Sequence, residues 1–258
     1  MRLIRSALVA LGLSVAAGPA AAQREAPVVA AASDLQFAVE EIASAFRDDT
    51  GRQVRLSLGS TGNFARQIRE GAPFQIFMAA DEDFVLDLHR DGFTRDDGVL
   101  YAVGRIVLAV PHGSPLSAEG GLDALAQALA EGRIDRFAIA NPEHAPYGMR
   151  AREALEGAGL WQALQPMMVL GENVSQAAQF ALSGNAEGGI IAWSLALAPR
   201  VAALGSFALI PEEAHTPLRQ RMVLLNGADE TAEAFFAYIQ SPAGRAILDR
   251  YGFALPER

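Results

Sequence analysis

The sequence predicts an α/β protein built from mainly parallel sheets flanked by helices. Apolar, strand-like runs alternate along the chain with segments whose apolar residues recur at helical spacing. Capping residues precede several of the helical segments, and glycines follow them. Strand and helix alternation of this kind favours parallel strands that are joined by helical crossovers.

The first series of elements begins with a buried strand at 28–33. The helix after it carries Leu35, Val39, Ile42 and Phe46 on one face. Asp34 can cap this helix and Gly51 can end it. Further strands are expected at 53–60 and 74–81, each followed by a helix, at 63–71 and 81–92.

The organisation changes after Tyr101. Residues 104–110 form a long apolar run that we expect to be an exposed strand, followed by a loop rich in Pro, Gly and Ser at 111–121. A second strand and helix series then extends to the C-terminus. Its strands are expected at 136–141, 167–171, 188–193 and 221–227, and its helices at 147–157, 174–182 and 230–253.

The N-terminus has the pattern of a secretory signal peptide. Arg2 and Arg5 precede an apolar run from Ala7 to Ala17, and small residues stand at a cleavage position near Ala22. The run is shorter than the roughly 20 apolar residues that span a bilayer. We therefore expect residues 1–22 to be a cleaved signal peptide and the mature protein to be periplasmic.

Composition narrows the classes of partner and chemistry. The chain has no cysteine and no lysine, so disulfides, thiol chemistry and zinc–thiolate sites are excluded. Without Arg2 and Arg5, 19 arginines face 30 acidic residues, which gives a formal charge of −11. This balance argues against nucleic acid or anionic lipid as a partner, because both are bound mainly through basic patches.

Small hydroxyl residues follow two of the predicted strands. Ser33 and Asp34 follow the first strand, and Ser60 and Thr61 lie in a Gly-Ser-Thr-Gly turn after the second. In α/β sheets ligands bind at the carboxyl ends of strands, where helices begin. A helix cap at the first turn and a plain structural turn at the second are the alternatives. Together the two turns favour a pocket that binds a small oxyanion through neutral donors.

Two later strand exits offer further donors. Tyr147 stands at the start of a helix after a Pro-bounded loop, and Val174 can offer a backbone N–H at another helix start. Signs of catalysis are few: the four histidines are scattered and there is no Gly-x-Ser-x-Gly elbow. The acidic run at 79–83 could bind a cation, but a solvated helix N-terminus is the favoured interpretation.

The order and spacing of these segments resemble those of the periplasmic molybdate-binding proteins of ATP-driven importers. The segments that carry the resemblance span nearly the whole mature chain: 29–46, 59–83, 100–110, 140–160 and 171–194. The resemblance implies a type II periplasmic binding fold with two lobes and a two-crossover hinge near Tyr101–Gly104. It assigns residues 23–103 and 212–258 to the first lobe and residues 104–211 to the second.

The resemblance also implies the ligand and the residues that bind it. The ligand would be molybdate or tungstate, bound without a resident cofactor by a monomer that delivers it to a membrane permease. The residues that match the family's ligand-binding positions are Ser33, Asp34, Ser60, Thr61, Tyr147 and Val174.

Asp34 departs from the family, in which some members have Asn or Leu. A carboxylate facing a dianion in a dry pocket is costly, so we expect Asp34 to turn its side chain towards helix N–H groups and to face the ligand with its backbone. If the carboxylate faces inward, it favours a protonated ligand such as hydrogen phosphate.

Two other functions remain open from the sequence. The same fold could bind sulfate, phosphate, another oxyanion or a small organic acid. An exported hydrolase that uses Asp81 and Asp83 is the other alternative, although nothing in the sequence places a nucleophile or a metal beside these acids.

Overall fold

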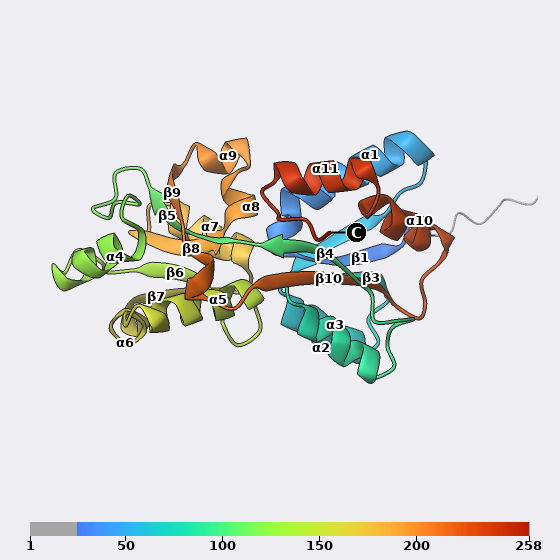
Figure 1. The fold of residues 1–258 in the computed structure, drawn as a ribbon, viewed down its shortest axis with the longest axis horizontal. Coiled ribbons are helices and arrows are strands. Elements are labelled where there is room, and N and C mark those ends of the chain that lie inside the picture. Colours follow the sequence, from blue (N-terminus) through green and yellow to red (C-terminus); the bar gives the residue numbers. More distant parts are fainter. Residues whose placement is uncertain (1–24, 258) are drawn as a thin grey trace, which may run out of the picture.

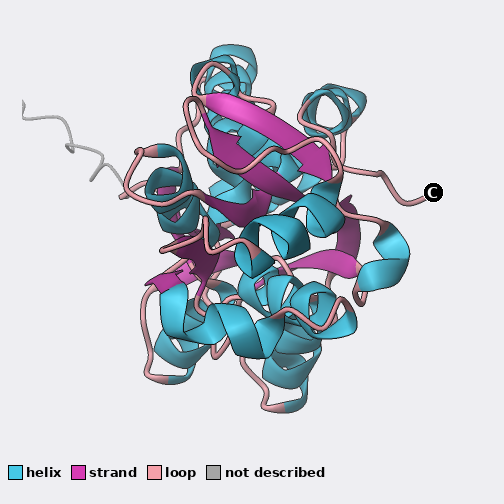
Figure 2. Cartoon of the chain, turned by 90° about the vertical axis from the view of Figure 1, so that its left-hand side faces the viewer, coloured by secondary structure: helices cyan, strands magenta, loops and turns pink. Residues whose placement is uncertain are grey.

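The computed structural model of the chain describes residues 25–257, and the predicted signal peptide at 1–22 lies outside them. Two five-stranded sheets lie side by side, each with its own helices, as Figure 1 shows. Viewed from one end of the molecule, helices surround the strands (Figure 2). Among the described helices none is long and apolar enough to cross a membrane.

Lobe one is the sheet ordered β2-β1-β3-β10-β4 with its flanking helices. Its strands are β1 (Val28–Ala32), β2 (Arg55–Gly59), β3 (Phe74–Ala79), β4 (Val99–Gly104) and β10 (Leu218–Leu224). Its helices are the short 3-10 turn η1 (Ser33–Leu35), α1 (Gln36–Thr50), α2 (Thr61–Arg69), α3 (Glu82–Arg90), α10 (Glu230–Ile239) and α11 (Pro242–Arg250). One apolar core lies under α1, α10 and α11, and another lies under α2 and α3 on the opposite face (Figure 1).

Lobe two is the sheet ordered β7-β6-β8-β5-β9 with its helices. Its strands are β5 (Ile106–Pro111), β6 (Phe137–Ala140), β7 (Met168–Gly171), β8 (Gly188–Ala192) and β9 (Gly205–Leu209). Its helices are α4 (Gly121–Ala130), α5 (Pro146–Gly157), α6 (Trp161–Leu164), α7 (Val174–Leu182), α8 (Trp193–Ala196) and α9 (Pro199–Ala202), and η2 (Gln165–Met167) follows α6. A single large apolar core unites this lobe.

Both sheets are mainly parallel, and each contains one reversed strand. In lobe one β10 is antiparallel to β3 and β4, and in lobe two β5 is antiparallel to β8 and β9. Each reversed strand is the first strand that the chain forms after it crosses from the other lobe. The two-lobed α/β fold predicted from the sequence is confirmed.

Two segments of the described chain join the lobes. Arg105 stands alone between β4 and β5, and residues 210–217, which include η3 (Glu212–Ala214), lead from β9 to β10. The predicted lobe boundaries at 103/104 and 211/212 fall near these segments and stay a prediction.

The expectation of an exposed strand at 104–110 is wrong. All six residues of β5 are buried, because β5 lies between β8 and β9 inside the sheet of lobe two. The run also contains the end of β4, so two strands from different lobes meet where the sequence indicated one. Apolar composition alone does not distinguish a central strand from an edge strand.

Candidate functional site

A small cavity of about 10 Å³ lies between the lobes, at the carboxyl ends of β1, β2 and β3. Lobe one contributes Ala32, Ser33, Asp34, Gly59, Ser60, Thr61 and Ala80, and lobe two contributes Ala145, Pro146, Tyr147 and Val174. All six residues that the sequence indicated as a site therefore line one cavity. They meet because parallel strands present their carboxyl ends at the same edge of a sheet.

Three helices begin at this cavity. Ser60 is the N-cap of α2, Tyr147 lies in the first turn of α5, and Val174 is the first residue of α7. The first N–H groups of a helix have no intrahelical acceptor, and the helix dipole places partial positive charge there. The cavity therefore favours an anion although the chain as a whole is acidic.

Four hydroxyl oxygens of the cavity each accept a hydrogen bond from an N–H group. Ser33 Oγ accepts from the backbone of Ser175 at 3.3 Å, and Ser60 Oγ accepts from the backbone of Asn63 at 3.4 Å. Thr61 Oγ1 accepts from Ala80 N at 3.0 Å. The fourth is the Tyr147 hydroxyl, which accepts from Gln220 Nε2 at 3.1 Å. A hydroxyl whose oxygen accepts in this way retains its hydrogen for a second partner.

The Gly-Ser-Thr-Gly turn has two roles in the structure. Ser60 caps α2, and its hydroxyl also pairs with His144 Nδ1 of lobe two at 2.8 Å. Gly62 donates its backbone N–H to the His144 carbonyl at 2.9 Å. The turn thus closes one side of the cavity as well as starting a helix.

The Asp34 carboxylate lies at the centre of a buried polar cluster. Its Oδ2 accepts from Tyr147 at 3.0 Å and from Gln220 Nε2 at 2.7 Å, and Tyr101 donates to Gln220 Oε1 at 2.8 Å. Asp34 is 1 % exposed, and its Oδ1 has no hydrogen-bond partner. Burial raises the pKa of Asp34 to about 6, against the opposing effect of hydrogen bonds from Gln220, from Tyr147 and from the backbone N–H groups of Asp34 and Leu35.

The expectation that the Asp34 side chain turns towards helix N–H groups is wrong for α1, and only the N–H groups of Asp34 and Leu35 in the 3-10 turn η1 act on its carboxylate. A 3-10 turn, η1, separates β1 from α1, so α1 begins at Gln36 and has no side-chain cap. The carboxylate instead forms its hydrogen bonds with Tyr147 of lobe two and Gln220 of β10. The cap interpretation of Ser33 fails for the same reason, since its hydroxyl pairs with Ser175 of lobe two.

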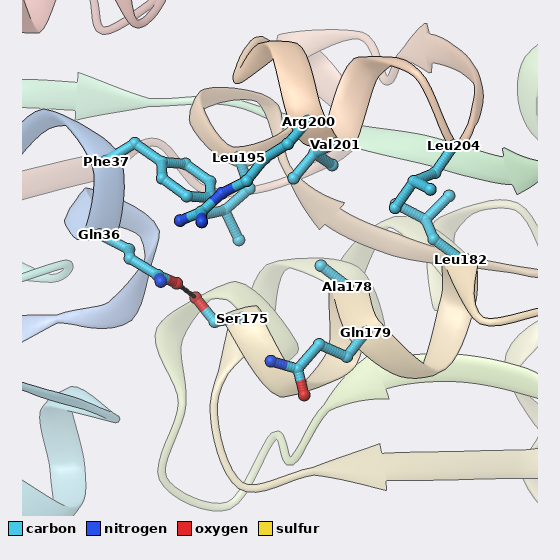
Figure 3. A pocket seen from close by; sticks show the side chains of 10 residues that line it. All are labelled: Gln36, Phe37, Ser175, Ala178, Gln179, Leu182, Leu195, Arg200, Val201 and Leu204. Atoms are coloured by element: carbon cyan, nitrogen blue, oxygen red, sulfur yellow. Dashed lines mark hydrogen bonds between the residues drawn. The ribbon is translucent and has the colours of Figure 1, made fainter.

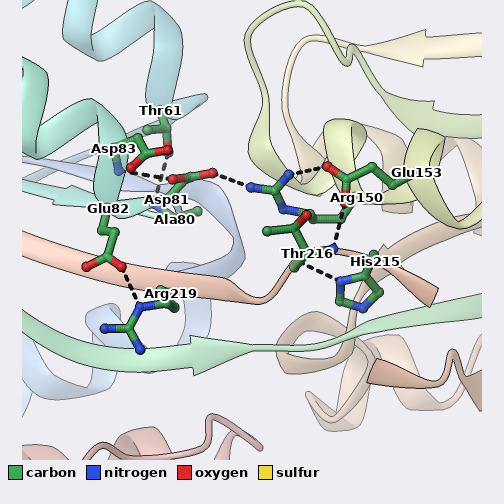
Figure 4. A network of polar contacts seen from close by, with 10 residues as sticks. All are labelled: Thr61, Ala80, Asp81, Glu82, Asp83, Arg150, Glu153, His215, Thr216 and Arg219. Atoms are coloured by element: carbon green, nitrogen blue, oxygen red, sulfur yellow. Dashed lines mark hydrogen bonds and ion pairs between the residues drawn. The ribbon is translucent and has the colours of Figure 1, made fainter. Parts of the chain in front are cut away.

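A network of charged groups closes the rim of the cavity on one side (Figure 4). Asp81 caps α3 by accepting from Asp83 N at 3.0 Å, and it pairs with Arg150 of α5 in lobe two. Arg150 also pairs with Glu153, which accepts from Thr216 N at 2.7 Å. The predicted solvated helix start is therefore partly wrong, because Asp81 caps the helix but is buried against Arg150.

On the other side, contacts around α7, α8 and α9 hold the lobes together, and Figure 3 shows a separate pocket of about 300 Å³ between these helices and α1. The Arg200 guanidinium lies 4.4 Å from the centre of the Phe37 ring, a cation–π contact between the lobes. The Ser175 hydroxyl donates to the Ser33 carbonyl at 2.8 Å, and Gln36 Oε1 lies 3.1 Å from the same hydroxyl as an alternative acceptor. Ser194 donates to the Asp34 carbonyl at 2.8 Å. Both lobes are therefore in direct contact around the cavity.

Sequence reasoning missed several residues that hold the cavity residues in place. Gln220, His144, Ser175 and Ser194 come from four separate segments of the chain. Gln220 lies just outside the strand expected at 221–227, and only the structure shows it inside β10 and fully buried. The others carried no signal, since Ser and His are common at helix starts and in loops.

Metal and hydrolytic chemistry find no support in the geometry. Within residues 25–257 no three metal-binding side chains lie close enough to hold an ion. Asp81, one of the two acids considered for a hydrolase, is already paired with Arg150.

Comparisons with known proteins agree on one type of protein. The sequence model of a family described as bacterial extracellular solute-binding protein matches residues 27–254. A molybdate-binding protein of Azotobacter vinelandii is 36% identical over 252 residues, which cover 96% of each chain. A molybdate-binding protein of Rhodobacter capsulatus is 31% identical over 253 residues, which cover 97% of this chain and 96% of that protein.

Solved structures show the same arrangement. The periplasmic molybdate-binding protein of Azotobacter vinelandii superposes with a TM-score of 0.79 at 30% identity and covers 90% of this chain and all of that one. A sulfate-binding protein from Mycobacterium tuberculosis shares the fold, with a TM-score of 0.72 at 16% identity over 90% of this chain and 87% of its own. The fold by itself therefore does not select the anion.

The raised pKa of Asp34 predicts how stability depends on pH. The folded protein binds this proton more tightly than the unfolded chain, so the contribution of Asp34 to the free energy of unfolding is greatest below about pH 4 and is lost as the pH rises through about 6. Asp34→Asn removes the titration. Its stability relative to the native protein should rise by about 2 kcal/mol between pH 4 and pH 8.

Urea unfolding of both proteins across this pH range measures the difference. Asp229→Asn is the matched control, because Asp229 caps α10 away from the cavity and Asn is an equally good cap. The raised pKa would be contradicted if the two proteins differed in free energy of unfolding by the same amount at every pH.

Proposed function

This chain belongs to the bacterial extracellular solute-binding proteins, and from that premise we propose that it captures molybdate for an ATP-driven importer. Proteins of this kind bind and release a solute and are not enzymes. We further propose that the protein acts in the periplasm after cleavage of residues 1–22, works as a monomer, and hands the ion to a membrane permease. Tungstate, an ion of the same charge and shape, is proposed as a second ligand.

One observation carries the choice of a tetrahedral oxyanion as ligand. The hydroxyl groups of Ser33, Ser60 and Thr61 each accept an N–H, so their hydrogens are available as donors around the cavity. The Tyr147 hydroxyl also accepts an N–H, but its hydrogen is directed to Asp34 Oδ2. A buried anion needs its hydration shell replaced, and each hydrogen bond to a charged group contributes about 1.5–3 kcal/mol. Several such donors support tight capture without a cation.

The proposed contacts follow from this pattern. The hydroxyls of Ser33, Ser60 and Thr61 donate to the anion, together with the backbone N–H groups of Asp34 and Val174. Tyr147 donates to the anion when its hydrogen turns away from Asp34 Oδ2. For Ser60 this requires the His144 tautomer that carries its hydrogen on Nδ1, because that nitrogen then donates to Ser60 Oγ and leaves the hydroxyl hydrogen free.

Movement of the lobes supplies the proposed route of capture and release. The lobes are joined by Arg105 and by residues 210–217, and further contacts between them lie beside the cavity, such as Ser60 with His144 and Asp81 with Arg150. Separation of the lobes breaks these contacts and admits water and the ion. Closure removes the ion from water and presents one closed surface to a permease.

An anion titration panel tests the proposed ligand. Isothermal titration calorimetry with molybdate, tungstate, sulfate and phosphate should show the two group-six anions binding most tightly, because the larger ions reach more of the donors at once. Binding of sulfate or phosphate, with no binding of either group-six anion, would instead establish the alternative oxyanion function that the fold also permits.

Removal of the Tyr147 hydroxyl tests the proposed contacts. Tyr147→Phe deletes a donor to the anion, so the dissociation constant for molybdate should rise about tenfold or more. Tyr238→Phe is the matched control, because that hydroxyl bonds Asp49 on the surface of lobe one. Equal affinity of the two variants would remove Tyr147 from the site.

A Cβ atom at Gly62 tests lobe closure. In Gly62→Ala the new atom would stand 2.6 Å from the His144 carbonyl oxygen of lobe two, so the lobes could not approach as closely. Molybdate affinity should fall about tenfold while the melting temperature of the free protein changes little. Gly157→Ala, whose Cβ meets no atom within 4 Å, is the control. Unchanged affinity in Gly62→Ala would contradict the closed arrangement around the anion.

A further inference from the structure

Asp34 contributes the one carboxyl group among the described residues that line the cavity. Its side chain is fully buried, Oδ2 accepts two hydrogen bonds, and Oδ1 has no partner. An unpaired buried carboxylate oxygen is costly, and a protein normally avoids it unless another group completes the site. Completion by an anion is impossible while both oxygens are bare acceptors, because anion and carboxylate would repel each other.

The same carboxylate also removes a donor from the cavity. The Tyr147 hydroxyl accepts from Gln220, and its hydrogen is directed to Asp34 Oδ2. For the other three hydroxyls no carboxylate competes for the hydrogen. With Asp34 ionised, the cavity therefore has one donor fewer and one negative charge more than an oxyanion site needs.

A single proton on Asp34 corrects both defects. On Oδ2, the added hydrogen can be donated to Tyr147, whose own hydrogen is then released for the anion. On Oδ1, the new O–H is itself an additional donor. In either case the balance is the same: one proton is taken up from solvent, the carboxylate becomes a neutral carboxylic acid, and the cavity gains one donor.

The surroundings of Asp34 favour this protonation and offer no competing charge. Tyr101 of β4, Tyr147 of α5, Gln220 of β10 and Ser194 of α8 face Asp34, and all are uncharged groups. Burial raises the pKa of both tyrosines well above their usual range, so neither is ionised near neutral pH.

Charged side chains around the cavity have other partners. Asp81 of lobe one pairs with Arg150 of α5, and Glu82 of α3 pairs with Arg219 and Arg221 of β10. His144, from the loop before α5, hydrogen-bonds to Ser60. None of these groups is hydrogen-bonded to Asp34, so no cation stabilises its ionised form.

We propose that this protein binds its oxyanion together with one proton, which is held by Asp34. The inference rests on the proposed function and specifies the protonation that accompanies binding. A fully ionised tetrahedral dianion such as molybdate is captured with net uptake of a proton from solvent. The burial of Asp34 supports this, since a pKa raised to about 6 in the free protein leaves the proton easily recruited.

Calorimetric titration of the whole mature protein with molybdate measures this coupling. From about pH 6.5 to about pH 9, the dissociation constant of the native protein should rise about tenfold for each pH unit. Paired titrations in Tris and in triethanolamine at one pH count the protons, because these buffers differ in ionisation enthalpy. Uptake of nearly one proton per molybdate is expected.

Asp34→Asn separates this proposal from the proposed function. Asn can accept from Tyr147 and Gln220 with its oxygen and present its NH₂ where Oδ1 lacks a partner. The variant should show no proton uptake, no dependence of affinity on pH, and tighter binding than the native protein at about pH 9. Asp229→Asn, which makes the same chemical change at the cap of α10, should retain the native slope.

Each result has one meaning. Molybdate binding by the native protein without proton uptake or pH dependence overturns this proposal and leaves the proposed function intact. Failure of both folded proteins to bind molybdate or tungstate at any pH overturns both. Hydrogen phosphate is the third ligand in the test. If it binds tightly without uptake of a proton from solvent, and molybdate binds weakly, the proton arrives on the anion. That result overturns the assignment of the proton to Asp34.

Discussion

Donation of N–H groups to hydroxyl oxygens is the interaction on which the cavity depends. Backbone N–H groups donate to Ser33, Ser60 and Thr61, and a side-chain amide donates to Tyr147. In the closed arrangement each hydroxyl is thereby fixed as a hydrogen donor. Together with three helix N-termini, these groups can hold a negative ion in a protein that has no lysine and a strongly negative formal charge.

This arrangement also explains how the two lobes meet. The N–H that donates to Ser33 and the amide that donates to Tyr147 each come from the opposite lobe. The donors are therefore oriented at the same time as the lobes come into contact. The Asp81–Arg150 pair and the contact of Arg200 with Phe37 also join the lobes there. An open form would lose both the contacts and the fixed direction of these hydroxyls.

Local patterns in the sequence were sufficient for most elements. The helix at Val174–Leu182 begins and ends where its periodicity predicted, because Asn173 caps it and its apolar face packs on lobe two. The family indicated by the spacing of segments is confirmed by the comparisons. The predictions failed at β5 and at η1. At β5 the neighbouring strands decide burial, and at η1 the opposite lobe decides which groups pair; neither is visible in the local pattern.

The sequence by itself determined the fold class, the family and the residues that converge on one cavity. Local periodicity and small polar turns mark where strands end and helices begin, and these are the positions of the cavity residues. Only the tertiary structure decided what those residues do to one another. Gln220 and Tyr147 lie 186 and 113 positions from Asp34, yet both bond its carboxylate. Burial between two lobes is a property of the packed chain, and it turns Asp34 from an expected helix cap into an acid whose proton the site requires.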